Sequence, residues 1–180
     1  AQIFGEPEDN IRVVVRDAGG NYGPRNALYF EHPLVLWAAK KIGRPVKWTS
    51  ERTETMLTDY QARDLVVDAE LALDETGKFI GFRTTNISNV GAFSASWLPL
   101  IKGIGISCSL YDVGVGYAHA VGVQTNTPPT YPYRSAGRPE VMYAIERLID
   151  RAAAEMGLDR IDIRRRNLIP PDAMPFTNAF

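Results

Sequence analysis

The chain has 180 residues, of which 45% are hydrophobic and 23% charged, so it is long enough to bury a core and fits one domain. Twenty Lys and Arg residues nearly balance 21 Asp and Glu residues, and a net charge of −1 offers no broad field for nucleic acid or an anionic membrane. The single cysteine, Cys108, excludes an internal disulfide and any iron–sulfur or zinc site built from several thiolates of this chain.

Neither a secretion signal nor a membrane span is expected. Residues 1–10 lack the basic and apolar regions of a secretion signal, and the chain has no run of about 20 apolar residues. These first residues are typical of a helix end followed by a turn, so we expect the chain to begin inside a longer protein. The low cysteine content is compatible with a reducing compartment, and a cytoplasmic location is the expectation.

The first third of the chain predicts a strand, a glycine-rich loop, a helix and a second strand. Ile11–Arg16 is rich in valine, as buried strands are. Leu28–Ile42 predicts a helix that ends at Gly43, and Pro33 allows its start to shift by one turn. Residues 44–50, RPVKWTS, predict the second strand.

The middle of the chain predicts a long β-hairpin. Residues 65–73 alternate between apolar and polar, residues 78–89 form the second strand, and the Asp-Glu-Thr-Gly turn between them supplies a position for positive φ. Residues 91–116 are rich in Gly and Ser without a clear period, which predicts irregular or short helical structure packed against a neighbour. Residues 117–124 predict a further strand.

The last third predicts a long polar loop followed by two helices and an extended tail. Residues 140–156 carry one apolar stripe and end at Gly157, and Asp159 is placed to cap a short final helix. Three successive arginines in that helix, Arg164, Arg165 and Arg166, are expected to form a solvated or salt-bridged face. Together the elements predict a single α+β domain over residues 1–180, with a mixed or antiparallel sheet packed by two to three helices.

The segment RDAGGNYGPR, residues 16–25, concentrates glycines between a predicted strand and a predicted helix. Glycines allow positive φ and leave no side chain between the amides and a bound anion. A Walker loop is excluded because Pro and Arg follow Gly23 in place of Lys and Ser or Thr. Ala18, Gly20 and Gly23 keep the spacing of a dinucleotide fingerprint, but no acidic residue ends the second strand and a hairpin follows. A tight turn without any ligand stays open as an alternative.

A second unusual loop, TNTPPTYPYRSAGRPE, spans residues 125–140. It carries Asn126, Arg134, Ser135 and Arg138 in front of a helix N-terminus, which favours anions. Arginines at such a place can form charge-assisted bonds to a carboxylate, a phosphate or an oxo group. A rigid surface loop with ordinary salt bridges is the alternative, and spacing alone does not decide between the two.

The two loops and the segments around them resemble the molybdenum-binding large subunit of the xanthine oxidase family, in particular the large chain of aerobic carbon monoxide dehydrogenases and their homologues. The resemblance is carried, in order along the chain, by DAGGNYG (17–23), GRPVKWTSERTE (43–54), RDLVVDAELALDETGKF (63–79), NVGAF (89–93), TNTPPTYPYRSAGRPE (125–140), ERLIDRAAAEMGLD (146–159) and RRRNLIPPDAMPF (164–176). It implies molybdenum held by the dithiolene of a molybdopterin cytosine dinucleotide, and oxidation of an aldehyde or N-heterocycle with oxygen from water. It also implies an iron–sulfur small subunit and an FAD-binding medium subunit as partners.

The resemblance assigns candidate site residues to both loops. The first loop is implied to touch the molybdopterin and its oxo ligand through backbone amides of Gly19, Gly20, Asn21, Tyr22 and Gly23. In the second loop, Arg134 is implied to position substrate near the metal and Ser135 lies beside it as a catalytic-site residue. Further cofactor contacts are implied at Ala136, Gly137 and Arg138. No side chain of this chain is expected to bind the metal. This interpretation requires that Gly20 and Arg134 line one cavity.

Some positions depart from the family pattern. Carbon monoxide dehydrogenases have a cysteine that holds a copper–sulfur unit where this chain has Ser135, and a hydroxyl suits Cu(I) poorly. Asn21 and Tyr22 replace the usual Gly and Phe, and Pro132 replaces an alanine. The sequence therefore disfavours carbon monoxide oxidation and leaves the substrate open, including the case of an inactive homologue.

The glutamate base of the family belongs to a motif beyond this chain, so the chain by itself is expected to be inactive. Glu31, Glu140 and Glu146 lie on predicted helices and are expected to make ordinary polar contacts, and His32 and His119 are expected to be structural. Two other functions remain possible from the sequence: a non-catalytic assembly or interaction domain that docks through residues 91–116, and a dinucleotide-binding domain with a parallel sheet.

Overall fold

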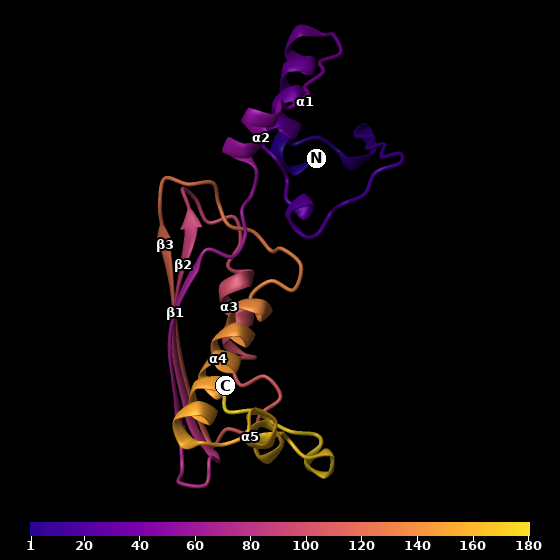
Figure 1. Cartoon of the computed structure of the whole chain (residues 1–180). Helices are drawn as coiled ribbons and strands as arrows, with labels where there is room; N and C mark the ends of the chain where they lie inside the picture. The colour runs from indigo at the N-terminus through magenta and orange to yellow at the C-terminus, as the bar shows by residue number, and fades with distance from the viewer. The chain divides into compact units, whose positions relative to one another are not determined.

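The structure, a computed structural model, describes all residues from 1 to 180 and divides them into two units, Ala1–Asp59 and Tyr60–Phe180. We refer to them as the N-terminal and C-terminal units and describe each by itself (Figure 1). Whether they act together as one domain, as the sequence predicts, stays a prediction. None of the helices combines the length and the apolar character that crossing a bilayer requires.

The N-terminal unit contains two helices and no strand. Helix α1, Glu31–Ile42, has Pro33 in its first turn and ends at Gly43 in the left-handed conformation, which confirms the predicted helix with a later start. Helix α2, Arg52–Thr58, escaped the sequence analysis although Glu51 and Glu54 form a reciprocal capping box at its start. Short 3-10 turns cover Gln2–Phe4 (η1), Glu8–Asn10 (η2) and Pro24–Asn26 (η3).

Both strands predicted in the N-terminal unit are wrong. Residues 11–16 and 44–50 belong to no strand, and Val13 and Val15 are 81% and 73% exposed. A valine-rich run fits a strand only when a neighbouring strand pairs with it, and neither segment has such a partner in this structure.

The C-terminal unit is built on a mixed sheet of the strands β1 (Leu65–Leu73), β2 (Phe79–Gly91) and β3 (Val115–Gln124) in the order β1-β2-β3. β1 and β2 are antiparallel and pair Leu65 with Ser88, which confirms the predicted hairpin, whereas β3 runs parallel to β2. The hairpin turn is fixed by the Asp74 carboxylate, which accepts hydrogen bonds from the N–H groups of Thr76 and Lys78.

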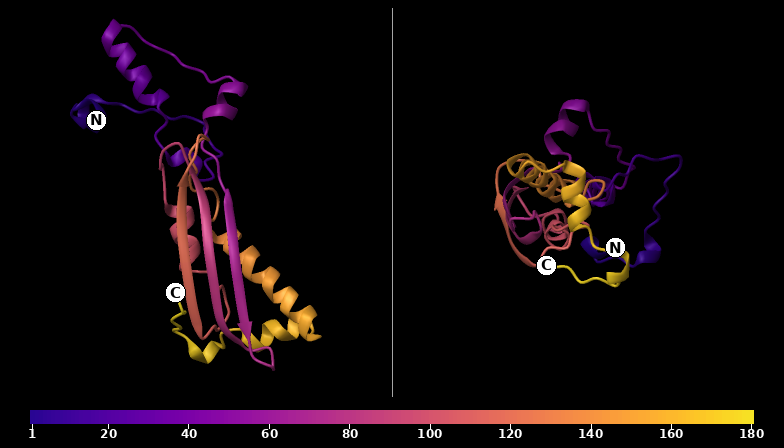
Figure 2. Two further views of the ribbon diagram at one scale, coloured as in Figure 1. Left: turned by 90° about the vertical axis from the view of Figure 1, so that its left-hand side faces the viewer. Right: turned by 60° about the horizontal axis from the view of Figure 1, so that its bottom comes forward.

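Helices α3 (Leu98–Ile104) and α4 (Arg138–Met156) cover one face of this sheet, and the other face carries no helix (Figure 2). Helix α5 (Arg160–Asn167) begins at Asp159, whose carboxylate accepts hydrogen bonds from the N–H groups of Ile161 and Asp162, as predicted. A 3-10 turn, η4, covers Pro171–Ala173 in the tail. The short α3 and the turns around it confirm the structure expected for residues 91–116, except that Gly91 still belongs to β2 and β3 begins at Val115, two residues before the predicted strand of residues 117–124.

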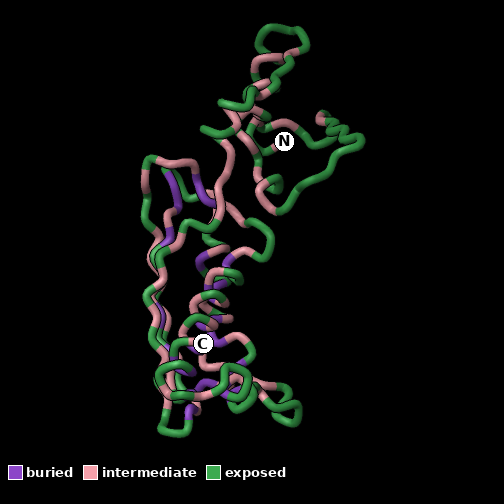
Figure 3. The backbone as a smooth tube through the Cα atoms, viewed as in Figure 1, coloured by how far each residue is buried: buried purple, intermediate pink, exposed green.

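The core lies between the sheet and helices α4 and α5. Its buried members are Phe79, Phe82, Cys108, Tyr111, Val113, Ile145, Ile149, Ala152, Ala153 and Ile163. Asn167 joins the hairpin to α5, because its side chain accepts a hydrogen bond from Phe79 N at 2.8 Å and donates one to Gly77 O at 2.8 Å. Every buried residue of the chain belongs to the C-terminal unit, as the colouring of Figure 3 shows. The N-terminal unit has none.

Candidate functional site

The glycine loop of the N-terminal unit, residues 16–25, is an exposed turn with several residues in the left-handed conformation. Gly20, Tyr22 and Gly23 have φ values of 75°, 51° and 112°. The Asn21 side chain fastens the turn, because its Oδ1 accepts a hydrogen bond from Gly23 N at 2.7 Å and its Nδ2 donates one to Asn26 at 2.8 Å. A Cβ added at Gly19 would meet no atom within 4 Å, so the backbone there is open to a molecule that approaches it.

A polar pocket of about 310 Å³ follows this loop within the N-terminal unit, and no pattern in the sequence predicted it. The Tyr29 hydroxyl donates a hydrogen bond to Asp59 and accepts one from Arg25 at 2.9 Å, while Arg25 and Asp59 form an ion pair of 2.9 Å. Burial, together with the hydrogen bond to Asp59, raises the pKa of Tyr29 to about 12. The Tyr29 hydroxyl therefore stays protonated near neutral pH, and its contacts tie the segment after the glycine loop to the end of α2.

The first limb of the second loop, residues 125–131, is bonded to the rest of the C-terminal unit. The Asn89 amide accepts a hydrogen bond from the Thr125 hydroxyl at 2.8 Å and donates one to Thr127 at 2.9 Å. Gln61 donates a side-chain hydrogen bond to Pro128 O at 2.8 Å, and its backbone forms a parallel bridge with Thr130. This limb is a fixed part of the fold.

The second limb of this loop, residues 132–137, ends in three successive residues with positive φ. These are Ser135 at 75°, Ala136 at 25° and Gly137 at 87°. Such values are costly for Ser and Ala, and they persist only where the surroundings enforce them. Two features require glycine at position 137. Its φ is positive, and a Cβ there would lie 2.1 Å from Pro99 O. The turn is closed by a hydrogen bond of 2.7 Å from Ala136 N to Tyr133 O, whereas the N–H groups of Ser135 and Gly137 donate to no protein acceptor.

The structure brings five predicted site residues together in this turn: Arg134, Ser135, Ala136, Gly137 and Arg138, where α4 begins. The Arg134 guanidinium is exposed and forms no ion pair or hydrogen bond, so its charge is available to a ligand. Gly19, Gly20, Asn21, Tyr22 and Gly23 lie in the other unit. That the two loops line one cavity stays a prediction.

Two further side chains, those of Arg63 and Glu140, lie at this turn. The role of Arg63 was not expected from the sequence. The Arg63 guanidinium donates hydrogen bonds to Tyr133 O and Arg134 O and lies over the Tyr133 ring at 5.1 Å. It also pairs with Glu140 Oε1 at 3.3 Å. No local motif signals these contacts, because Arg63 is 71 residues from Arg134 in the chain and only the fold joins them.

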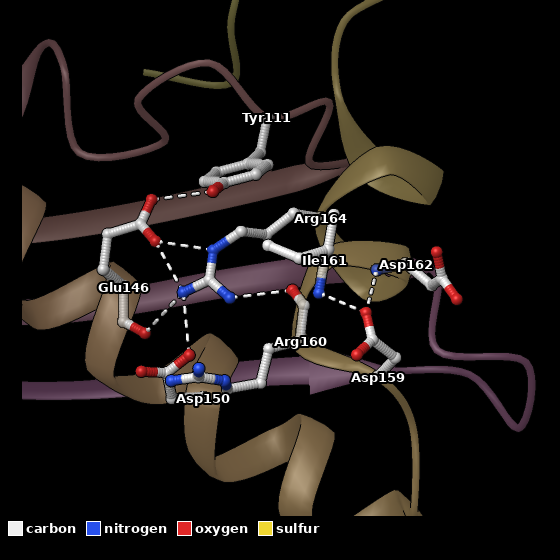
Figure 4. Close-up of polar contacts among 8 residues, drawn as sticks. All are labelled: Tyr111, Glu146, Asp150, Asp159, Arg160, Ile161, Asp162 and Arg164. Atoms are coloured by element: carbon white, nitrogen blue, oxygen red, sulfur yellow. Dashed lines mark hydrogen bonds and ion pairs between the residues drawn. The ribbon is translucent and has the colours of Figure 1, made fainter.

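Glu140 and Glu146 make polar contacts within the fold, as predicted. Glu146 accepts hydrogen bonds from the Tyr111 hydroxyl at 2.7 Å and from Arg164 Nε at 2.9 Å, and Arg164 also pairs with Asp150 (Figure 4). Arg165 pairs with Asp162 and Arg166 is exposed, so the predicted solvated or salt-bridged face of these arginines is confirmed. Glu31 lines the polar pocket of the N-terminal unit.

The remaining titratable candidates lie apart from the second loop. Burial raises the pKa of the Cys108 thiol to about 11, so the thiol is protonated and unreactive in the core. His32 lies against the Tyr29 ring in the N-terminal unit, at 5.9 Å between ring centres, and His119 is exposed on β3. No group of three His, Cys, Asp or Glu side chains is arranged to hold a metal ion.

Comparison with known proteins agrees with the resemblance seen in the sequence. A family model described as the molybdopterin cofactor-binding domain matches residues 1–168. The gamma subunit of the 6-hydroxypseudooxynicotine dehydrogenase complex of Paenarthrobacter nicotinovorans is 37% identical over 98% of the chain and 22% of its own length. The Cu,Mo-CO dehydrogenase superposes with a TM-score of 0.92 and 32% identity over 99% of the chain and 23% of that structure. Quinoline 2-oxidoreductase from Pseudomonas putida 86 superposes with a TM-score of 0.86 and 33% identity, over 90% of the chain and 21% of that structure. The chain thus spans less than a quarter of the length of these relatives.

Proposed function

The chain belongs to the family of molybdopterin cofactor-binding domains, and on that premise we propose that it is the part of a molybdenum hydroxylase large subunit that holds the cofactor. The match of the family model to residues 1–168 carries this proposal, because it includes both candidate loops. The relatives are molybdenum oxidoreductases of the xanthine oxidase family, so the proposed activity is the oxidation of a small substrate.

The donors of the second loop fit an anionic, oxygen-rich group. The N–H groups of Ser135 and Gly137 are unpaired, and the turn lies at the N-terminus of the 19-residue helix α4, where the helix dipole favours negative charge. Arg134 adds a full positive charge that no carboxylate of the chain neutralises. These features support the assignment of Ala136, Gly137 and Arg138 to cofactor contact. The backbone of Gly19–Gly23 is proposed as the second set of contacts.

When bound, the molybdenum cofactor supplies the two-electron oxidation of a substrate carbon, with the oxygen taken from water. The residues of this chain bind and orient. Arg134 is proposed to hold an electronegative atom of the substrate by a charge-assisted hydrogen bond. Ser135, exposed beside it, provides a hydroxyl that can donate or accept. No residue of this chain is proposed as the base that abstracts the proton.

The proposed substrate is an aldehyde or an N-heterocycle, and carbon monoxide is disfavoured. Copper in its Cu(I) state prefers a thiolate, whereas the loop offers the hard hydroxyl of Ser135. The only thiol of the chain, Cys108, is buried in the core with 1% exposure. The similarity to the Cu,Mo-CO dehydrogenase is thus less informative about the substrate than the similarity to quinoline 2-oxidoreductase, because quinoline is an N-heterocycle.

Finer features of the whole protein are part of the same proposal. We propose the cytosine dinucleotide form of molybdopterin, and electron transfer to an iron–sulfur small subunit and an FAD-binding medium subunit. The words "complex subunit gamma" in the name of one relative support an assembly of several subunits. A cytoplasmic location completes the proposal.

Metal and pterin analysis tests the function. The protein that carries this chain, with its flanking regions, is produced in a host that makes the cofactor. We expect about one molybdenum per polypeptide, a fluorescent pterin after oxidation, and cytidine monophosphate after hydrolysis. Gly137→Ala should lower the molybdenum content, because a Cβ would lie 2.1 Å from Pro99 O. Gly157→Ala is the matched control, since Gly157 is left-handed at the other end of α4 and has no atom within 4 Å of its added Cβ. Wild-type protein free of molybdenum and pterin would contradict the proposal.

The other functions considered from the sequence have less support. A dinucleotide-binding domain requires a parallel sheet next to the glycine loop, but the N-terminal unit has no strand and the sheet of the C-terminal unit begins with an antiparallel pair. An assembly module could use the exposed side chains of residues 91–116, such as Trp97 and Ile101 at 46% and 62% exposure. An enzyme domain that packs against further domains would show the same exposure, so this observation favours neither function.

A further inference from the structure

We propose that Arg63 is a positioning residue that holds the turn from Arg134 to Gly137 in the conformation in which it meets the cofactor. This inference rests on the function proposed above for the nature of the ligand. The positioning itself rests only on contacts within the C-terminal unit.

The guanidinium of Arg63 reaches the turn from outside the loop. It donates to two successive carbonyl groups, Tyr133 O at 3.4 Å and Arg134 O, directly before the first left-handed residue. Its plane lies over the Tyr133 ring at 5.1 Å. A planar group with several donors in a fixed fork can fix two carbonyl directions at once, which a lysine cannot do. These carbonyls define the direction in which the chain enters Ser135.

The backbone of Arg63 is itself held on both sides. Arg63 has a φ of 62°, which is rare for a residue with a long side chain. On one side, Gln61 pairs with the first limb of the loop through Gln61 N to Pro129 O and Tyr131 N to Gln61 O. On the other side, Asp64 accepts a hydrogen bond from the Asn89 amide at 2.9 Å. Arg63 therefore extends from a fixed base across the loop, from its first limb to its second.

Glu140 completes the arrangement from helix α4. Its Oε1 pairs with Arg63 at 3.3 Å, its side chain is only 12% exposed, and its Oε2 is buried without a hydrogen-bond partner. A carboxylate in that environment depends on the Arg63 charge more than a surface carboxylate would. Arg63 thus ties the last turn of the loop to the first turn of α4 through the carbonyl groups of the turn and the Glu140 carboxylate.

Limited proteolysis with trypsin tests the positioning without any cofactor. Cleavage of the Arg134–Ser135 bond requires the turn to open, and mass spectrometry of the peptide that ends at Arg134 measures its rate. In the intact chain we expect Arg63→Ala to speed this cleavage at least about 10-fold and Arg63→Lys about threefold. The lysine variant keeps the charge beside Glu140, so it carries the test if the alanine variant does not fold.

Two controls separate the turn from the whole molecule. Cleavage after Arg83, in the middle of β2, reports global unfolding and should stay within about twofold of the wild-type rate. Arg147→Ala removes another arginine from the groove between β1 and α4 that has no contact with the turn, and it should leave cleavage at Arg134 unchanged. Equal rates at Arg134 in wild type and both Arg63 variants would overturn the proposal. An increase as large in Arg147→Ala would do the same.

The link to the cofactor has a separate readout. In the holoprotein after partial reduction, Arg63→Lys is expected to change the Mo(V) electron paramagnetic resonance spectrum at equal molybdenum content, whereas Arg147→Ala should not. Identical spectra in wild type and Arg63→Lys would overturn the link. Wild-type protein without molybdenum would instead overturn the proposed function, and the tryptic result would still decide whether Arg63 positions the turn.

Discussion

The two units of the chain differ in how they keep their apolar side chains. The C-terminal unit buries Ile145, Ile149, Ala153 and Ile163 completely between a sheet and two helices. The N-terminal unit has no buried residue, and Val13 and Met56 remain 81% and 70% exposed. A layered core can offset the conformational entropy lost on folding, whereas exposed apolar side chains cannot.

This difference separates the two candidate loops. The second loop, residues 125–140, is held by hydrogen bonds from Arg63, Asn89 and Gln61 and belongs to the unit that has a packed core. The glycine loop belongs to a unit without a core, and within the loop the Asn21 side chain accepts a hydrogen bond from Gly23 N. The loop that contains Arg134 is therefore shaped by its own unit, whereas the glycine loop has no packed core beneath it within its unit.

Hydrogen exchange gives the largest expected contrast. In the intact chain, amides in β2 and α4 should be protected about 1000-fold or more, because their opening requires loss of the core. Amides in α1 should be protected about 10-fold or less, since no residue of that helix is buried. Mass spectrometry of peptic peptides measures both. Similar protection in the two units would show that the N-terminal unit is as stably packed as the C-terminal unit.

Cavity-creating substitutions test the difference between the two units at single positions. Ile149→Ala should lower the free energy of unfolding by about 3 kcal/mol, because Ile149 is 0% exposed in the core. Leu36→Ala in α1, where the side chain is 51% exposed, should cost less than about 1 kcal/mol. Urea denaturation followed by near-UV circular dichroism checks the first, and helix content checks the second. Equal losses would mean that α1 is packed in solution.

The same contrast explains which elements could be predicted from the sequence. The hairpin of residues 65–91 and helix α4 carry local patterns, namely alternation with an Asp-Glu-Thr-Gly turn and an apolar stripe ended by Gly157, and both formed as expected. The valine run of residues 11–16 carries an equally clear local pattern, but a strand also needs a partner, and no local pattern supplies one.

The site divides in a similar way. The loop residues Arg134 to Arg138 could be named from the resemblance, because they are contiguous in the sequence. Arg63 could not, since it lies 71 positions before Arg134 and meets it only when the hairpin and the parallel strand between them have folded. The parallel pairing of β3 with β2 is likewise non-local, and no local sequence pattern predicts it.

Glycine-to-alanine substitutions compare the two loops directly. Gly137→Ala should cost about 2 kcal/mol or more, because φ is 87° and the new Cβ would lie 2.1 Å from Pro99 O. Gly20→Ala should cost about 1 kcal/mol, because φ is 75° but the nearest atom is a Tyr22 ring carbon at 3.5 Å. Denaturant midpoints of the two variants measure the difference. A larger loss at Gly20 would show that the glycine loop is the more constrained of the two.

Alkaline titration gives the smallest expected effect and is confined to the core of the C-terminal unit. Burial raises the pKa of the Cys108 thiol from 9.0 to about 11, so the folded protein keeps a proton that the unfolded chain releases. The unfolded state then binds fewer protons above pH 9, and the thiol contribution to stability is complete below that pH and is lost as the pH rises toward 11. Between pH 9 and 10 the loss should be about 1 kcal/mol. Because tyrosines and lysines ordinarily titrate in the same pH range, the measured quantity is a difference between wild type and Cys108→Ala. It is the difference in the slope of the free energy of unfolding against pH. Parallel slopes would mean that the thiol is hydrated in the folded state, and that the core is looser around Cys108 than its 1% exposure indicates.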